Sequence, residues 1–159
     1  NKGGRDLEAA FINMLMLQGI SPIWLGGIGA DRPKIGDNKY DIDALVIDRH
    51  EKFLHVYLFG VTGGTISDKD LEKIQNFAEW VRKEVEKVQR LFVNVYPIIV
   101  TNQLVSEQLK KDAKDRNVWI VDGESLKSLL TLATKSFLGK KFLNQILTYA
   151  SLLTGITSY

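Results

Sequence analysis

Carboxylates at the start of a β-rich run are the residues of this sequence that could hold a metal ion. Asp43 precedes an apolar stretch, and Glu8 lies near the start of the chain. Hard cations such as Mg²⁺ prefer oxygen ligands, and a bound ion can activate water for attack on a phosphodiester. In the next β-rich run Tyr57, Phe59 and Val61 share one face, because side chains alternate along a strand. That face is apolar, so it offers no further ligand for an ion at Asp43.

A helix and a hairpin are predicted around these carboxylates. Apolar residues recur at helical spacing from Asp6 until Gly19, which predicts a first helix. Residues 40–47 and 53–61 are rich in β-formers, and the polar residues 48–52 between them have the length of a hairpin turn. The two strands should therefore pair as antiparallel neighbours.

The rest of the sequence alternates helices and strands. Ser67 and Asp70 have the spacing of a capping box at the start of a helix with apolar residues every three or four positions. Strands followed by helices that return the chain predict an α/β fold with a mixed central sheet flanked by helices. The other expected elements are a short strand at 20–25, a Gly-rich loop at 26–36, the long helix from 68 to about 89, a strand at 91–100, a helix capped by Thr101 or Asn102, a strand at 118–121 and C-terminal helices beyond Ser125.

This order of elements resembles the PD-(D/E)XK superfamily, which has the restriction-endonuclease-like fold. Glu8 in the first helix, Asp43 at the second strand and the turn of residues 118–126 carry the resemblance. The early Asp-Ile-Asp stretch and the late Val-Asp-Gly-Glu turn are most similar to archaeal resolvase and Mrr-type members. The resemblance implies a PD-(D/E)XK-like domain at 5–132 and a C-terminal helical extension at 133–159.

In active members of the superfamily, a helix Glu, a strand Asp and a Glu-x-Lys pair surround one or two Mg²⁺ ions. By this resemblance Glu8 matches the helix Glu and Asp43 the strand Asp, whereas Phe59 replaces the Glu and Val61 the Lys. The resemblance therefore implies a metal site at Glu8 and Asp43 that is weak or absent, in an inactive domain without a cofactor. Mg²⁺ would be needed only if activity is retained through ligands that have moved to the long helix. The candidates for such migrated ligands are Glu72, Lys73, Gln75 and Glu79.

Both retained carboxylates also have structural interpretations. Glu8 is expected in the first turn of a helix, where the helix dipole stabilises a negative side chain. Asp43 could cap the Gly-rich loop or pair with Arg32, Lys34 or Lys39. Neither residue therefore establishes a metal site on its own.

A basic cluster in the second half of the chain is the candidate nucleic-acid-binding surface. The formal net charge of +2, from 21 basic and 19 acidic residues, predicts no general attraction to nucleic acid, so binding requires a local patch. On the long helix, acidic residues interleave with the basic ones, which favours a salt-bridged exposed face. The candidate cluster consists of Lys110, Lys111, Lys114 and Arg116.

The C-terminal segment has a wide apolar face. Apolar residues recur at helical spacing from Phe137 to Leu153. This pattern fits a core helix of the domain, or a helix covered by a second copy in a homodimer or by a missing neighbouring domain. The candidate interface residues are Phe137, Phe142, Ile146 and Leu153.

Composition and length predict one globular domain of 159 residues. The chain has no Cys, which excludes disulfides and thiolate metal sites. It also lacks a run of about 20 apolar residues that could span a bilayer, so we expect no membrane partner and a cytoplasmic location. Because the sequence does not begin with Met, we expect a domain of a longer chain or a processed product.

Three functions follow from these patterns. The leading prediction is a catalytically inactive nuclease-like domain that acts as a nucleic-acid-binding or assembly module in a DNA- or RNA-processing system of a prokaryote or its virus. The second is an active Mg²⁺-dependent endonuclease with migrated catalytic residues. The third is an oligomerisation domain without a nucleic-acid role.

Overall fold

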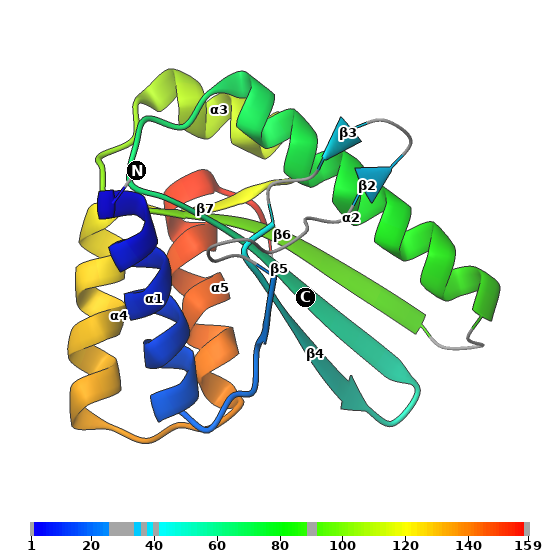
Figure 1. Ribbon diagram of the computed structural model, residues 1–159, viewed down its shortest axis with the longest axis horizontal. Helices are drawn as coiled ribbons and strands as arrows, with labels where there is room; N and C mark the ends of the chain where they lie inside the picture. The colour runs from blue at the N-terminus through cyan, green and yellow to red at the C-terminus, as the bar shows by residue number, and fades with distance from the viewer. Residues whose placement is uncertain (1, 26–33, 36–37, 40–41, 89–91, 158–159) are drawn as a thin grey trace.

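A five-stranded mixed sheet forms the centre of the molecule, seen in a computed structural model (Figure 1) that describes residues 2–25, 34–35, 38–39, 42–88 and 92–157. The strand order is β1-β4-β5-β6-β7. β4 is antiparallel to β1 and β5, whereas β6 is parallel to β5 and β7. The bounds are Ile23–Trp24 for β1, Ala44–His50 for β4, Phe53–Thr62 for β5, Phe92–Thr101 for β6 and Trp119–Val121 for β7.

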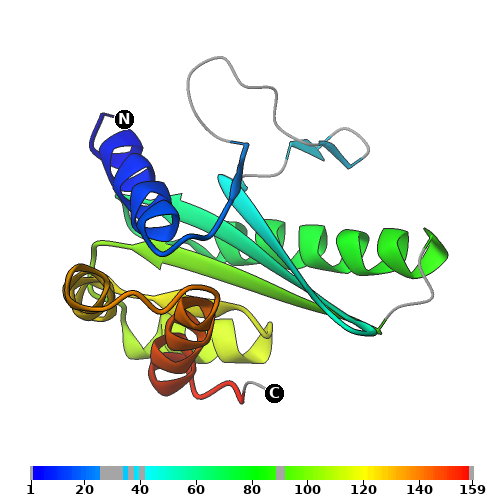
Figure 2. The same ribbon diagram turned by 90° about the horizontal axis from the view of Figure 1, so that it is seen from below.

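Helices cover both faces of this sheet. α2 and α3 lie on one side of the strands, and α1, α4 and α5 lie on the other (Figure 1). Figure 2, which looks onto the second side, shows that α1, α4 and α5 leave the hairpin end of β4 and β5 uncovered. The bounds are Lys2–Leu17 for α1, Asp68–Val88 for α2, Glu107–Asp115 for α3, Gly123–Lys135 for α4 and Lys141–Thr154 for α5.

The predicted α/β class with a mixed central sheet flanked by helices is confirmed by this arrangement. The predicted hairpin is also present, with Ala44 opposite Phe59 in the β4–β5 ladder. At the start of α2, the side chain of Asp70 accepts from the backbone N–H of Ser67, and the Ser67 hydroxyl accepts from the Asp70 N–H. This reciprocal pair is the expected capping box.

Two local predictions are corrected. α3 begins later than expected, because Ser106 rather than Thr101 or Asn102 is its N-cap and accepts from the N–H of Leu109. β2 (Lys34–Ile35), at the end of the predicted Gly-rich loop, pairs with β3 (Asn38–Lys39), which follows that loop, in a separate two-stranded antiparallel sheet. Sequence patterns miss such short strands because two residues carry no periodicity.

The strand-to-helix turn after β7 depends on a close approach of two chain segments. Asp122 is the N-cap of α4 and accepts from the N–H of Ser125. A Cβ at Gly123 would lie 2.5 Å from the carbonyl oxygen of Asn102, so a residue with a side chain does not fit without movement of the backbone. The Asp-Gly pair thus joins the end of β7 to the segment after β6.

The C-terminal helix belongs to the core of the domain. Phe142 and Ile146 are fully buried in the cluster that joins α1, α4 and α5 to the sheet. The expectation that these two residues face a partner is therefore wrong, because buried residues of the chain's own α1, α4 and sheet pack in the same cluster. Leu153 packs, partly buried, near the α2 side of the core, whereas Phe137 precedes α5 and is 73% exposed.

None of the helices in the described parts of the chain has the length and apolar character needed to cross a membrane.

Candidate functional site

Glu8 is a buried carboxylate held by an aromatic side chain. Its Oε1 accepts a hydrogen bond of 2.5 Å from the indole Nε1–H of Trp24 in β1. Because α1 begins at Lys2, Glu8 lies beyond the first turn, and the predicted stabilisation by the helix dipole does not apply. The indole satisfies this carboxylate, so its burial requires no metal ion.

Asp43 is a second buried carboxylate, and its partner is the neighbouring strand. Its Oδ2 accepts a hydrogen bond of 2.6 Å from the backbone N–H of Val61 in β5. Of the partners expected from the sequence, Arg32 lies outside the described residues, as do the side chains of Lys34 and Lys39.

The two residues that stand where the resemblance expects the Glu-x-Lys pair belong to the apolar core. Phe59 is 0% exposed and packs edge-on against Phe11 of α1, with ring centroids 5.0 Å apart. Val61 packs, partly buried, against the same cluster. A carboxylate and an ammonium group at these two positions would have to be desolvated against Phe11 and its neighbours.

The two retained carboxylates do not share one cavity. Asp43 lines a hollow of about 180 Å³ together with Thr62 of β5 and with Asp70 and Ile74 of α2. Glu8 is not among the residues that line it, and α1 packs instead on the face that holds Phe59. Sequence spacing could not reveal this separation, since it depends on which face of the sheet each helix covers.

Two of the proposed migrated ligands on the long helix do not line the hollow at Asp43. Asp70 brings a carboxylate to the hollow at Asp43, but its Oδ2 already accepts from Ser67. The proposed migrated ligands Gln75 and Glu79 instead line a different groove. Among the described residues, no group of three or more His, Asp and Glu side chains is placed to hold a metal ion. The carboxylates present therefore do not fit the Mg²⁺ site that the resemblance implies.

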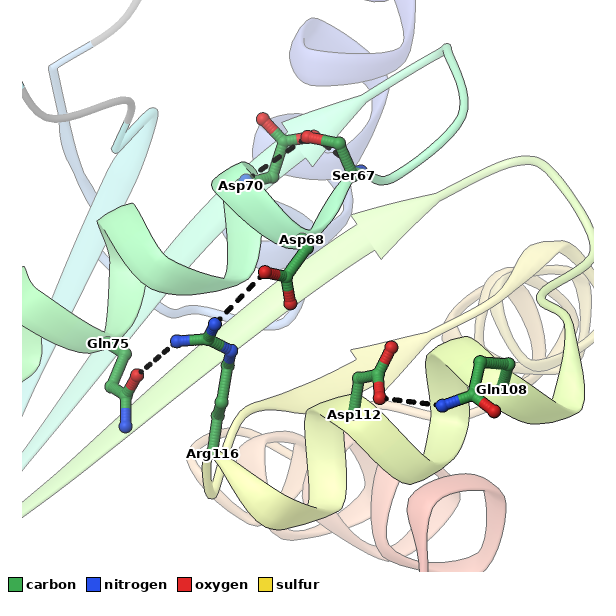
Figure 3. Close-up of polar contacts among 7 residues, drawn as sticks. All are labelled: Ser67, Asp68, Asp70, Gln75, Gln108, Asp112 and Arg116. Atoms are coloured by element: carbon green, nitrogen blue, oxygen red, sulfur yellow. Dashed lines mark hydrogen bonds and ion pairs between the residues drawn. The ribbon is translucent and has the colours of Figure 1, made fainter.

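Ion pairs engage half of the predicted basic cluster on α3. Arg116 bonds to Asp68 at 3.1 Å and to the side-chain oxygen of Gln75 at 3.0 Å, which ties the end of α3 to α2 (Figure 3). Lys110 bonds to Glu107 at 2.9 Å within the helix. Acidic side chains also lie on α3, including Asp112, which accepts from Gln108 (Figure 3). The helix is therefore a mixed rather than a uniformly basic surface.

A groove beside β6 was not predicted from the sequence. It has a volume of about 610 Å³ and lies between α2, the outer edge of β6 and the residues that end α3 and α5. Its cations are Arg82, Lys114 and Arg116, and its one carboxylate is Glu79. Among the described residues, Arg82 and Lys114 have no ion-pair partner. The groove along this strand therefore has a net positive charge.

An aromatic ladder runs along the sheet face opposite α2. The rings of Tyr57 and Tyr96 stack at 4.9 Å, and Tyr96 also meets Trp119 edge-on at 5.6 Å. The hydroxyl of Tyr96 lies 3.1 Å from Nδ1 of His55. Burial raises the pKa of Tyr57 above its ordinary value, and the nearby Tyr96 and Asp48 raise it further. Burial also raises the pKa of Tyr96, so both phenols stay neutral under ordinary conditions.

Comparison with known proteins gives a distant structural likeness. No family of known proteins and no curated protein matches the sequence. The chain is similar to the small subunit of the heterodimeric restriction endonuclease R.BspD6I, with a TM-score of 0.44 and 12% sequence identity. The similarity covers 92% of this chain and 88% of that one. A likeness this distant carries no inference about activity or assembly.

Proposed function

We propose that this chain is a nuclease-like domain that does not cleave nucleic acid and serves as an assembly module. The observation that carries the proposal is Phe59, which occupies the expected position of a metal-binding carboxylate and is fully buried against Phe11. The engagement of Glu8 by Trp24 and of Asp43 by Val61 supports the same conclusion. Each carboxylate has a structural partner, so neither needs a catalytic role to account for its burial.

The distribution of charge favours a role in protein assembly over binding to a nucleic acid. The predicted cations Lys110 and Arg116 are paired within the chain. Arg82 and Lys114, which have no ion-pair partner in the part of the chain that the structure describes, instead line a groove that runs beside a strand edge. A groove of this kind suits a protein segment better than a duplex, which needs a broad surface that meets many phosphates.

A cleavage assay tests the absence of activity. Purified protein is incubated with single- and double-stranded DNA in Mg²⁺ and in Mn²⁺, and we expect no cleavage above a protein-free control. The Phe59→Glu/Val61→Lys variant should also remain inactive, because the supporting residues around a restored pair are missing. Cleavage by the wild type that disappears in Asp43→Ala would overturn the proposal and favour an enzyme with migrated ligands.

A further inference from the structure

We propose that the groove beside β6 binds an extended acidic peptide segment of a partner protein, which adds to the sheet as a further strand. The inference deepens the proposed function, on which it rests for the assembly role, by naming the class of partner and the surface. Three observations on the described residues carry it: a length of strand edge without a neighbouring strand, a groove along that edge, and two cations in its walls that have no ion-pair partner there.

The first observation is the free edge of β6. Within the described residues, β7 pairs with β6 from Ile98 to Val100, and no strand lies beside the preceding part of β6. This edge is residues 93–97, which at about 3.3 Å per residue spans roughly 16 Å. Unpaired strand edges present N–H and C=O groups that can pair with another chain.

The direction of the backbone groups follows from Phe92. Its N–H donates to the carbonyl oxygen of Lys52 at 2.9 Å, which directs Phe92 toward β5. Because successive residues of a strand direct their N–H and C=O groups to opposite sides, Val93 and Val95 direct theirs away from β5. Pro97 continues this alternation and lacks an N–H, which strands tolerate on an edge. In the described parts of the chain, nothing bonds to the outward backbone groups of Val93 and Val95.

The second observation is that the groove follows this edge. One wall is a stripe of α2 in which Gln75, Ala78, Glu79 and Arg82 recur at helical spacing. The opposite wall comes from the end of α3 and from residues 155–157 after α5. The volume of about 610 Å³ lies within the range of about 300–1,000 Å³ that is typical of ligand sites. A short extended segment therefore fits between the two walls.

The third observation is the charge of the walls. Arg82 stands on the α2 wall, and Lys114 stands on the opposite wall, where its side chain lies against Gly155. Neither has an ion-pair partner among the described residues, whereas Arg116 is paired with Asp68. Side chains of an added strand alternate between the two walls, so acidic residues on both faces of the segment could reach a cation. The aromatic residues of the groove, Tyr96 and Trp119, are buried, so they offer no exposed ring on which a nucleobase could stack.

The test uses fluorescence anisotropy with a labelled ten-residue peptide in which pairs of Glu residues alternate with pairs of Val or Thr residues, so that both faces of the extended peptide carry Glu. Two further peptides have the same sequence but carry N-methyl groups on the odd or on the even backbone nitrogens. Since only one set of peptide amides faces β6 in an added strand, we expect one methylated peptide to lose binding and the other to retain it. Equal binding by both methylated peptides would overturn the inference, because a purely electrostatic complex does not distinguish them.

Protein variants test the walls of the groove. We expect Arg82→Gln/Lys114→Gln to weaken binding of the unmodified peptide by about tenfold. The matched control Lys87→Gln/Lys111→Gln removes two exposed cations outside the groove and should bind as the wild type does. Amide exchange at Val93 and Val95 should slow when the peptide binds. Unchanged affinity in the Arg82/Lys114 variant would contradict the inference, as would oligothymidine that binds the groove while the peptide does not.

The experiments distinguish a failure of the proposed function from a failure of this inference. Cleavage of DNA would overturn the proposed absence of activity and leave the peptide result intact. Absence of peptide binding by a protein that does not cleave DNA would overturn this inference alone.

Discussion

The backbone N–H of Val61 donates a hydrogen bond of 2.6 Å to Oδ2 of Asp43. This bond joins β5 to the residue that precedes β4, next to the pair formed by Ala44 and Phe59. Asp43 is buried, so an N–H···carboxylate bond at this position is poorly screened by water. Asp43, the carboxylate that most resembles a metal ligand, thus connects the two strands at the open end of the hairpin.

Replacement of Asp43 should therefore change stability. We expect Asp43→Ala to lower the free energy of unfolding by about 1–3 kcal/mol, because the N–H of Val61 loses its acceptor. Asp43→Asn keeps an oxygen at the same position and should cost less. Urea denaturation followed by circular dichroism measures both variants. Equal losses in the two variants would show that the hydrogen bond is not the cause.

Phe59 is expected to contribute more to stability than any exposed aromatic residue. Phe59→Ala should lower the free energy of unfolding by about 3–5 kcal/mol, since it removes a fully buried ring that packs against Phe11. Phe53→Ala is the matched control in the same strand, where the ring is 45% exposed, and should cost about 1 kcal/mol or less. Similar losses in both variants would contradict the assignment of Phe59 to the core.

Stability should fall at alkaline pH because of the buried tyrosines. Burial raises the pKa of Tyr57 and of Tyr96 in the folded protein, whereas in the unfolded chain a tyrosine titrates near pH 10. Below pH 10 both states hold the proton, so these residues add no pH dependence. Above pH 10 the unfolded state loses its protons first, and the free energy of unfolding decreases as the pH rises.

Tyr57→Phe tests this origin, because it retains the ring and removes the proton. The variant should show a smaller decrease in the free energy of unfolding between pH 9 and pH 11 than the wild type. The control is Tyr149→Phe, which alters a partly buried tyrosine outside the ladder. If the free energy of unfolding fell equally with pH in the wild type and in Tyr57→Phe, a group other than Tyr57 would cause the loss of stability at alkaline pH.

The elements that the sequence predicted well are those with a complete local signal. The capping pair Ser67 and Asp70 and the apolar period behind it define α2, and the polar turn between two β-rich runs defines the hairpin. Asp122 and Gly123 likewise mark the start of α4 through a cap and a close backbone approach. Each of these signals involves residues close together in the sequence, so it can be recognised without the tertiary structure.

The candidate sites depended on relationships that no local pattern contains. The partner of Glu8 is Trp24, which β1 places beside α1. Arg82 and Lys114 lie far apart in the sequence and line one groove because β7 begins only opposite Ile98 and leaves the preceding part of β6 without a neighbour among the described strands. Ile146 is buried because α5 packs against β7 and α4. The short length of β7 was visible in the sequence and was the one signal that could have pointed to the free edge.

Any affinity of α3 for duplex DNA should be weak and strongly dependent on salt. Lys111 and Lys114 are the members of the predicted cluster without an ion pair among the described residues. Two phosphate contacts at about 0.9 each give a slope of about 1.8 for the decrease of log affinity with log salt concentration. Lys111→Gln/Lys114→Gln should abolish this binding. A slope near that of four contacts would mean that Lys110 and Arg116 leave their partners to bind phosphates.

The C-terminal helix provides the sharpest test of how the chain covers its apolar surface. Ile146 is fully buried in the core, so Ile146→Ala should lower the free energy of unfolding by about 2–5 kcal/mol. Phe137 is 73% exposed in the connection before α5, so Phe137→Ala should change it by no more than about 0.5 kcal/mol. Because α5 is covered within the chain, neither change should alter the sedimentation coefficient of the folded protein. A dimer that dissociates on Ile146→Ala without loss of stability would show instead that α5 packs on a second copy.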